Sequence, residues 1–503
     1  MTDGAENKSG AESETVPDSG GSLFRSFVSV FTGRATVLVI TIAFTPVLVR
    51  LLTPREFGVF ATVMAMFTVV EAVGKGGLFS AIANQVAKFD PGDSEESDAS
   101  LAGIALAAVY GVVITIVLAG AVGLSIVPET YELHLLVLAS GLLVGNLFTA
   151  FQGVYYGRRQ EWVAERVGVL WQLLYAVLAV ALAVAMGLVG VFVGYVVAMF
   201  VATAVLWWTF TRDVEVTAGR IGRALRSQGR PIASFGAVQT LGGLAGILLH
   251  RTDILLVNYF RSVTESGIYR AALVPAEVIW FVPFVIQLSL LQNASSHWAK
   301  GDIDQIDTDT AGSFKYAFLA LTLFGVGLFG LAEEFVVLYF GPAYASAATP
   351  LRILLVGAFL FGLSRAFTPT LKATGHNVAT ELVTGVGLVV NVVLNLLLIP
   401  RFGMTGAATG TAISYGVMLA GSLFVWRRTP FGFPSLRIVG VLCLHLLAFA
   451  VLYLPLIAIV PLGPLPSIVV GGVAGALLFL GLAVWMGLLS RSQLRVGATL
   501  ASR

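Results

Sequence analysis

Fourteen apolar segments of about 20 residues follow one another along the chain, and they constrain its fold more than any other feature. A helix of this length spans the ~30 Å hydrocarbon core of a bilayer and satisfies its own backbone hydrogen bonds. Hydrophobic residues make up 57% of the 503 residues and charged residues only 12%, too few to cover a water-soluble surface of this size. We therefore expect an all-α, multi-pass membrane protein with about 14 transmembrane helices. The segments are 24–52, 58–81, 101–127, 133–156, 165–186, 188–211, 234–259, 267–291, 314–340, 351–372, 379–399, 406–426, 436–460 and 467–489.

The basic residues are distributed unevenly between the two sides of the predicted bundle. Of 30 Lys and Arg residues, 20 fall in segments on the side of the N-terminus and 6 on the opposite side. Short loops rich in Lys and Arg remain in the cytoplasm, so both termini are expected there, in a cell membrane. Residues 1–23 and 490–503 are then predicted cytoplasmic tails, the first of them disordered. Residues 212–233, which contain five arginines, are expected to form a basic cytoplasmic linker.

Two short motifs occur twice at nearly the same spacing, which indicates an internal repeat. Residues 55–61 match residues 264–270 at an offset of 209, and a set of three glycines recurs at an offset of 216. We therefore predict a six-helix N-lobe at 24–211, a six-helix C-lobe at 234–426, and two further helices at 436–489. Because each unit has an even number of helices, a pseudo-two-fold axis along the membrane normal should relate the lobes. The repeated glycines are Gly187, Gly190 and Gly194, with Gly403, Gly406 and Gly410.

Several classes of site are excluded or disfavoured. A net charge of +2 provides no basic surface for nucleic acid. The single cysteine, Cys443, excludes intrachain disulfides and cysteine clusters, and the five histidines lack metal-ligand spacing. We expect no catalytic residue, no bound metal and no cofactor. The acidic stretch 90–98 is predicted to be a solvated loop.

Seven ionisable residues inside the predicted helices are the candidate site residues, because a charge there costs roughly 2.5–3.5 kcal/mol on insertion scales. Arg34 lies ~15 Å into the first helix, where it faces water unless it snorkels to the inner interface. Glu71 and Lys75, four residues apart, form either a local ion pair or a substrate contact. The seven are the cations Arg34, Lys75, Arg251 and Arg365 and the acids Glu71, Asp253 and Glu277.

The remaining candidates lie in the predicted C-lobe. Arg365 shares a helix face with Lys372, which suits a bound anion, although Lys372 can also lie at the interface. For Asp253, near Arg251, a structural charge pair at a helix end is the better explanation. Glu277 lies deep in its helix and must be protonated, paired with a cation such as Arg34, or exposed in a cleft. It is the foremost candidate for coupling to H⁺ or Na⁺, and Glu71 and Asp253 are the other two candidates for this role.

Asparagines occupy one face of the predicted helix 379–399. Asn391 and Asn395 lie four residues apart, so their side chains point to the same side of the helix. Hydrogen bonding between helices is the ordinary role of such side chains in membranes.

Three motifs resemble those of the polysaccharide transporter family of O-antigen-type flippases. This family belongs to the multidrug/oligosaccharidyl-lipid/polysaccharide exporter superfamily, and the likeness covers residues 24–489. The motifs are LLTPREFGVF at 51–60, DILL at 253–256 followed by GIY at 267–269, and NLLLIPRFGMTGAA at 395–408.

The resemblance implies two six-helix lobes around a central cavity. It also implies a flippase that moves a polyprenyl- or dolichyl-phosphate-linked oligosaccharide from the cytoplasmic to the outer leaflet, and not an enzyme. Arg34, Lys75, Arg251 and Arg365 are the positions that could form the cationic cavity of such a protein. The expected partners are the lipid-linked oligosaccharide and the bilayer, with a glycan polymerase or ligase and glycosyltransferases as further candidates. A monomer is expected to suffice.

Two other functions are considered. A cation-coupled multidrug exporter would have the same fold, but that group typically has twelve helices and an acidic cavity. A membrane polysaccharide polymerase or glycosyltransferase would usually need a large outer loop or a catalytic domain. No predicted outer loop is longer than about a dozen residues, which makes the enzyme less suitable.

Overall fold

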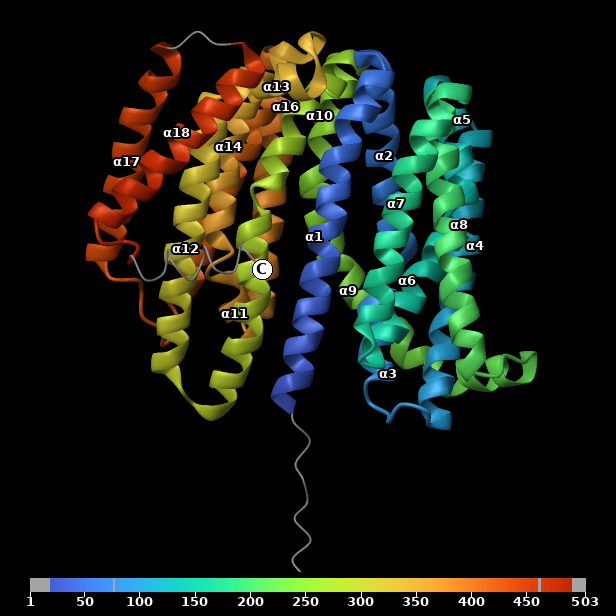
Figure 1. The fold of residues 1–503 in the computed structure, drawn as a ribbon. Helices are drawn as coiled ribbons and strands as arrows, with labels where there is room; N and C mark the ends of the chain where they lie inside the picture. Colours follow the sequence, from blue (N-terminus) through green and yellow to red (C-terminus); the bar gives the residue numbers. More distant parts are fainter. Residues whose placement is uncertain (1–18, 76, 460–462, 491–503) are drawn as a thin grey trace, which may run out of the picture.

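The computed structural model describes residues 19–75, 77–459 and 463–490, and the regular structure of these residues is helical. Figure 1 shows two groups of upright helices side by side, with α1 in front between them. The predicted tails, except for residues 19–23 and 490, lie outside the described residues. The first group is α1 (Ser19–Leu51), α2 (Pro54–Lys75), α3 (Leu78–Val86), α4 (Ser94–Gly123), α5 (Glu129–Ser140), α6 (Leu142–Gly157), α7 (Glu161–Met186) and α8 (Leu188–Asp213).

The second group begins with the 43-residue helix α9 and ends with two further helices, α17 and α18. Residues 218–233 of the predicted linker are the first turns of α9, and they pack against the N-lobe helices α3 and α4. The elements are α9 (Ala218–Phe260), α10 (Val263–Val278), α11 (Phe281–Lys300), α12 (Ile303–Gly330), α13 (Ala332–Phe340), the 3₁₀ helix η1 (Pro342–Ala347), α14 (Ala348–Ser364), α15 (Thr368–Ala373), α16 (Asn377–Trp426), α17 (Leu436–Ile459) and α18 (Pro464–Trp485).

The number of membrane crossings agrees with the predicted fourteen. Among the described residues, 11 helices are long and apolar enough to cross a membrane, and two bent pairs raise this number to 13. The pairs are α5 with α6 and α10 with α11, bent by 43° and 44°. The 50-residue α16 would extend about 75 Å at 1.5 Å per residue, but its backbone is non-helical at Gly403. Its two halves are therefore separate crossings, which completes the fourteen.

The predicted internal repeat is confirmed by its glycines. Gly187 joins α7 to α8 with φ 59° and ψ −144°, and Gly403 joins the halves of α16 with φ 57° and ψ −139°. A side chain at either position would be strained, because this backbone region is open essentially to glycine alone. Three residues later, a Cβ atom on Gly190 would overlap the Leu182 carbonyl, and one on Gly406 would overlap that of Leu398. The two turns thus share the same packing as well as the same glycines.

The lobes meet near the first turns of α2 and α10, two helices whose labels lie toward the upper end of Figure 1. The contact is made by a pair of glycines that the repeat makes equivalent. A Cβ atom on Gly58 of α2 would overlap the carbonyl oxygen of Val263, and one on Gly267 of α10 would lie 2.7 Å from the Gly58 nitrogen. The hydroxyl groups of Thr62 and Ser266 are 3.4 Å apart in the same contact. Small residues let membrane helices approach this closely, so the upper ends of the lobes are tightly joined.

The contacts between the lobes do not follow the pseudo-two-fold axis throughout. Helix α2 packs along α9, whereas the symmetry-related pair, α1 and α10, has at most isolated contacts within the described residues. Helix α1 instead packs on α7 and reaches the C-lobe through its upper half, where Tyr339 donates a hydrogen bond to the carbonyl of Ile42. The lobes are therefore closed along α9 and open between α1 and α10.

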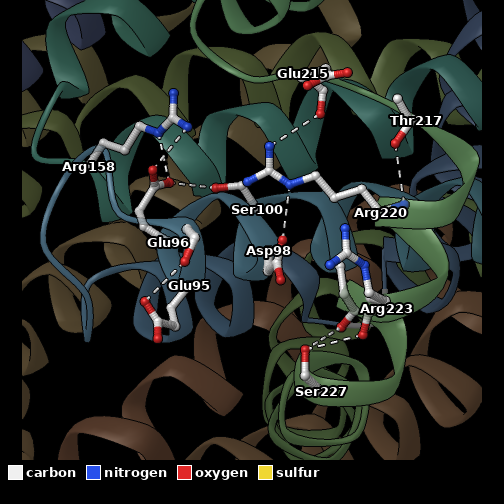
Figure 2. Close-up of polar contacts among 12 residues, drawn as sticks. Glu95, Glu96, Asp98, Ser100, Arg158, Glu215, Thr217, Arg220, Arg223 and Ser227 are labelled. Atoms are coloured by element: carbon white, nitrogen blue, oxygen red, sulfur yellow. Dashed lines mark hydrogen bonds and ion pairs between the residues drawn. The ribbon is translucent and has the colours of Figure 1, made fainter.

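A buried ion pair joins the first turn of α4 to the end of α6 in the N-lobe (Figure 2). Arg158 donates from Nε and Nη2 to the two carboxylate oxygens of Glu96, at 2.9 and 3.2 Å, and Ser100 donates to the same carboxylate at 2.8 Å. Next to it, Arg220 of α9 contacts Asp98 at 3.2 Å. The prediction of a solvated loop at 90–98 is therefore wrong for residues 94–98, which belong to α4. The acidic residues lie in the first turns of α4, where the helix dipole favours carboxylates. One of them, Glu96, is buried against Arg158, which follows it by 62 residues.

Replacing Arg158 with Met should destabilise the protein strongly. The side chains of Arg158 and Glu96 are only 6% and 2% exposed, so the substitution leaves a buried carboxylate without its cation. Breaking such a pair from one side costs about 3–5 kcal/mol, whereas replacing both partners by apolar side chains is often neutral. Thermal unfolding of the purified protein checks this. We expect a lower midpoint for Arg158→Met and recovery in the double variant with Glu96→Met; equal midpoints for the two variants would contradict it.

Candidate functional site

The candidate cations of the N-lobe are each next to an acid. Arg34 of α1 lies 3.7 Å from Glu165 of α7 and remains 56% exposed, while the Glu165 side chain is 9% exposed. Lys75 lies 3.0 Å from Glu71 on the same helix. This local ion pair is one of the two alternatives predicted for these residues. Each of these two candidate cations thus has a carboxylate partner that offsets its charge.

Two of the C-lobe candidates, Arg251 and Glu277, form a cluster with Arg270 that has an excess of positive charge. Arg270 Nη1 lies 3.0 Å from Glu277 Oε1 on α10, and Arg251 Nη1 of α9 lies 4.0 Å from the same oxygen. The side chains are 21–28% exposed, so they are accessible without being on the surface. Glu277 is therefore paired with Arg270 and Arg251; the suggested pairing with Arg34 is not observed. Two arginines share one carboxylate, which leaves this cluster with a net charge of +1.

Arg270 was not among the predicted site residues, because its position near the start of a helix placed it in an outer loop. Its side chain instead extends along α10 toward Glu277, seven residues later. Two residues seven apart lie on the same face of a helix. The spacing of Arg270 and Glu277 could therefore have predicted their ion pair.

Arg365 differs from the other cations in its partners. It caps the C-terminal end of α14, where Nη1 donates to Gln287 Oε1 at 2.5 Å and the guanidinium lies 4.6 Å from the Phe361 ring centroid. No carboxylate among the described residues lies within the 4.0 Å of an ion pair. Lys372, which shares its helix face in the sequence, is 2.8 Å from Glu381.

Asp253 lies at the centre of a buried hydrogen-bond network in the C-lobe. Its Oδ2 accepts from the hydroxyls of Tyr269 and Thr411, both at 2.9 Å. Asn391 donates to Thr411 at 3.2 Å, and Asn395 donates to Asn391 at 3.0 Å. Asn391 therefore makes the interhelical contact expected of it, between the two halves of α16, whereas the bond of Asn395 lies within one helix half. Through Asp253, Tyr269 and Thr411 the network joins α9, α10 and α16.

Two oxygens of this network have no donor among the described residues: Asp253 Oδ1 and Asn395 Oδ1. Asp253 is 1% exposed, and no Lys, Arg or His of the described chain is within ion-pair distance. It is therefore not a charge pair at a helix end. A buried carboxylate in this position must bind a proton or a cation, because an isolated negative charge is too costly in a low-dielectric interior.

The equivalent place in the N-lobe is aromatic. There the rings of Phe44 and Tyr175 lie 5.2 Å apart, and those of Tyr175 and Tyr195 lie 5.4 Å apart. The same helical scaffold therefore packs without an acid at this position, so the polar network is not needed to build a lobe. By the repeat offsets of 209 and 216 residues, Asp253 corresponds to Phe44, Asn391 to Tyr175 and Thr411 to Tyr195.

An apolar groove of about 520 Å³ runs beside the cationic cluster. Helices α1, α12, α13, α17 and α18 line it together with α10, and its side chains are apolar or aromatic. On α10, Val274 and Val278 face the groove, while Arg270 and Glu277 form the ion pair of the cluster. One helix thus contributes to both the charged cluster and the apolar groove.

Comparison with known proteins identifies relatives in glycan assembly. A family model described as "Polysaccharide biosynthesis protein" matches residues 47–349. An uncharacterized membrane protein of Methanocaldococcus jannaschii is 26% identical over 191 residues, 38% of each chain. A probable low-salt glycan biosynthesis flippase of Haloferax volcanii is 21% identical over 188 residues, 37% of this chain and 40% of that protein. The chain thus spans about two fifths of the length of these curated relatives.

Solved structures share the fold across much more of the chain. The lipid II flippase MurJ, in an inward closed conformation, superimposes with a TM-score of 0.70 at 12% identity, over 93% of this chain and 98% of that one. An inward-facing multidrug transporter of the MATE family and the MOP superfamily gives 0.64 at 17% identity, over 78% and 94%. A MOP superfamily transporter from Pyrococcus furiosus, described as having a binding pocket of reverse polarity, gives 0.57 at 18% identity, over 81% and 95%. The predicted two-lobe exporter fold is confirmed.

Proposed function

Because the chain belongs to the family of polysaccharide biosynthesis proteins, we propose that it is a flippase for a lipid-linked oligosaccharide. The substrate is a polyprenyl- or dolichyl-phosphate that carries an oligosaccharide, and it moves from the cytoplasmic to the outer leaflet. One observation carries the proposal: α10 presents a cationic cluster and an apolar groove side by side. A molecule with a charged headgroup and a long hydrocarbon tail matches both surfaces at once.

The arginines of the cluster are suited to the phosphate of the headgroup. Arg251 and Arg270 share a single acid, Glu277, so the cluster can take up a further negative charge. A guanidinium group binds phosphate through two parallel hydrogen bonds, and the fit is better than for an ammonium group. A charged headgroup cannot cross hydrocarbon unaided, so a protein path with these residues lowers the barrier. Arg34 and Lys75 of the N-lobe are the further cations proposed to line this path.

Movement of the lobes would expose the path to one side at a time. On the predicted orientation the upper end faces outward, and there Gly58 and Gly267 hold the lobes together. The opening between α1 and α10 adjoins the apolar groove, so a lipid tail can stay in the groove while the headgroup enters between the lobes. Outward release then requires the glycine contact to separate. This is alternating access of two parallel repeats.

The Asp253 network is the proposed coupling site. Asp253 Oδ1 and Asn395 Oδ1 are acceptors without donors, so either a proton on Asp253 or a Na⁺ ion between oxygen ligands would satisfy them. The ion would bind within one lobe, where it joins α9, α10 and α16. Glu277 already has two arginine partners, and Glu71 has Lys75, so both are less suited to this role.

A cation-coupled multidrug exporter is the second candidate, since transporters of that class share the fold. A cationic drug would need an accessible acid, and Asp253 is 1% exposed.

In the proposed scheme, glycosyltransferases at the cytoplasmic face supply the substrate. A polymerase or ligase at the outer face uses it, and a monomer carries out the transfer.

Charge reversal at the cluster tests the proposed function. Arg270→Glu places a second acid next to Glu277, so the phosphate should be repelled and the substrate should accumulate in the cytoplasmic leaflet. Lipid-linked sugar is measured in each leaflet of cells that express the variant. Arg401→Glu, an exposed arginine outside the cluster, is the matched control and should deliver substrate normally. Normal outer-leaflet delivery by both Arg270→Glu and Arg251→Glu would count against the cationic path.

A further inference from the structure

A small polar pocket lies inside the C-lobe, apart from the apolar groove. It has a volume of about 140 Å³, and its walls come from α9, α11, α14, α15 and α16, which all belong to this lobe. Arg365 and Lys372 are its charged side chains, and the described residues that line it include no Asp or Glu. Because a single lobe forms the pocket, rocking of the two lobes does not dismantle it.

Arg365 lines this pocket without an acidic partner among the described residues. A guanidinium group has five N–H donors, and the described contacts of Arg365 use one of them, on the amide oxygen of Gln287. Its other neighbour is the ring of Phe361, which supports a cation but does not neutralise it. Lys372 has its own acid in Glu381, so Arg365 carries the net charge of the pocket.

Charge and size together define the ligand. A half-buried arginine within a membrane helix bundle needs a counter-charge or a function, and no carboxylate of the described residues lies within ion-pair distance of Arg365. A water molecule needs about 10–15 Å³ of such space, so the pocket has room for several waters or a tetrahedral oxyanion. The hydroxyl-bearing residues Thr368, Thr384 and Ser422 complete a wall that is polar but not acidic.

We propose that this pocket binds a phosphate-type oxyanion, with Arg365 as its main partner. The anion has two sources with the same chemistry: the phosphate of a lipid headgroup or free inorganic phosphate. Only the first source rests on the proposed flippase function. In both cases the anion sits within the C-lobe rather than between the lobes, and it neutralises the guanidinium group that Gln287 and Phe361 hold in place.

Binding to the purified full-length protein in lipid nanodiscs tests the proposal. Radiolabelled inorganic phosphate should bind the wild type and bind Arg365→Gln at least about tenfold more weakly, because a charge-assisted bidentate contact is lost. Arg352→Gln is the matched control: it removes the same charge from the same helix, α14, where Arg352 contacts the Phe329 carbonyl and not the pocket. This control should bind phosphate like the wild type.

A short-chain prenyl phosphate added to the same assay distinguishes the sources. Displacement of the labelled phosphate shows that a lipid headgroup enters the pocket, and absence of displacement shows that the free ion is the ligand. Ser422→Leu fills the pocket without removing Arg365, and it should also abolish phosphate binding even if Arg365→Gln fails to fold. Phosphate binding that is equal in the wild type, Arg365→Gln and Ser422→Leu would overturn the proposal. The leaflet assay of the flippase function is independent of this result.

Discussion

Transport by Asp253→Asn should lose its dependence on the ion gradient, and its rate should fall by about 10- to 150-fold. The asparagine keeps the size of the side chain and can still accept from Tyr269 and Thr411, but it removes the negative charge. Contacts to a charged group contribute about 1.5–3 kcal/mol, which corresponds to that range of rates at tenfold per 1.4 kcal/mol. The measurement is the initial rate of lipid-linked oligosaccharide transfer in proteoliposomes with an imposed Na⁺ or H⁺ gradient.

Glu277→Gln is the control for this result. Its charge is already matched by Arg270 and Arg251, so the variant should transport more slowly but still respond to the gradient. Comparison of Na⁺ with H⁺ gradients identifies the ion in the wild type. An Asp253→Asn protein with the gradient response of the wild type would remove the network from the coupling scheme.

A disulfide across the upper contact should stop transport completely and reversibly. The Thr62 and Ser266 hydroxyl oxygens are 3.4 Å apart, so cysteines at both positions lie within reach of a disulfide. The bond would fasten α2 to α10 at the point where Gly58 and Gly267 touch, and outward opening requires these helices to separate. The experiment uses a background in which the single native cysteine, Cys443, is replaced by Ser.

Oxidation of Thr62→Cys/Ser266→Cys should reduce transfer to the level of empty vesicles, and a reducing agent should restore it. Each single cysteine variant, treated identically, should remain active. If a fully cross-linked protein still transferred substrate, the upper contact would not need to open, and the rocking motion would be excluded.

The helices could be predicted from the sequence because the signal for each is local. An apolar run of about 20 residues specifies a crossing wherever it occurs, and all fourteen predicted segments correspond to helices. The repeat could be predicted for a similar reason. Gly187 and Gly403 occupy a backbone conformation that other residues adopt poorly, so the duplicated turn retains its glycine.

Among the candidate site residues, the ion pair of Glu71 and Lys75 within one helix could be predicted, but the contacts between helices could not. A buried charge is conspicuous in an apolar helix, so Arg365, Asp253 and Glu277 were identified at once. Their partners depend on how helices far apart in the sequence pack: Asp253 meets Thr411 across 158 residues. The ion pair of Glu96 with Arg158 could not be predicted from the sequence either, because its partners are 62 residues apart. An acidic run before a helix is usually solvated, so nothing in the sequence indicates that Glu96 is buried.

The most direct test of the proposed function is transfer of a lipid-linked oligosaccharide by the purified protein. Proteoliposomes receive the substrate in one leaflet, and a membrane-impermeant glycosidase measures the sugar that reaches the other leaflet. We predict that transfer requires the protein, rises with an imposed cation gradient, and disappears in oxidised Thr62→Cys/Ser266→Cys. Equal transfer in vesicles with active, cross-linked and no protein would contradict a flippase function.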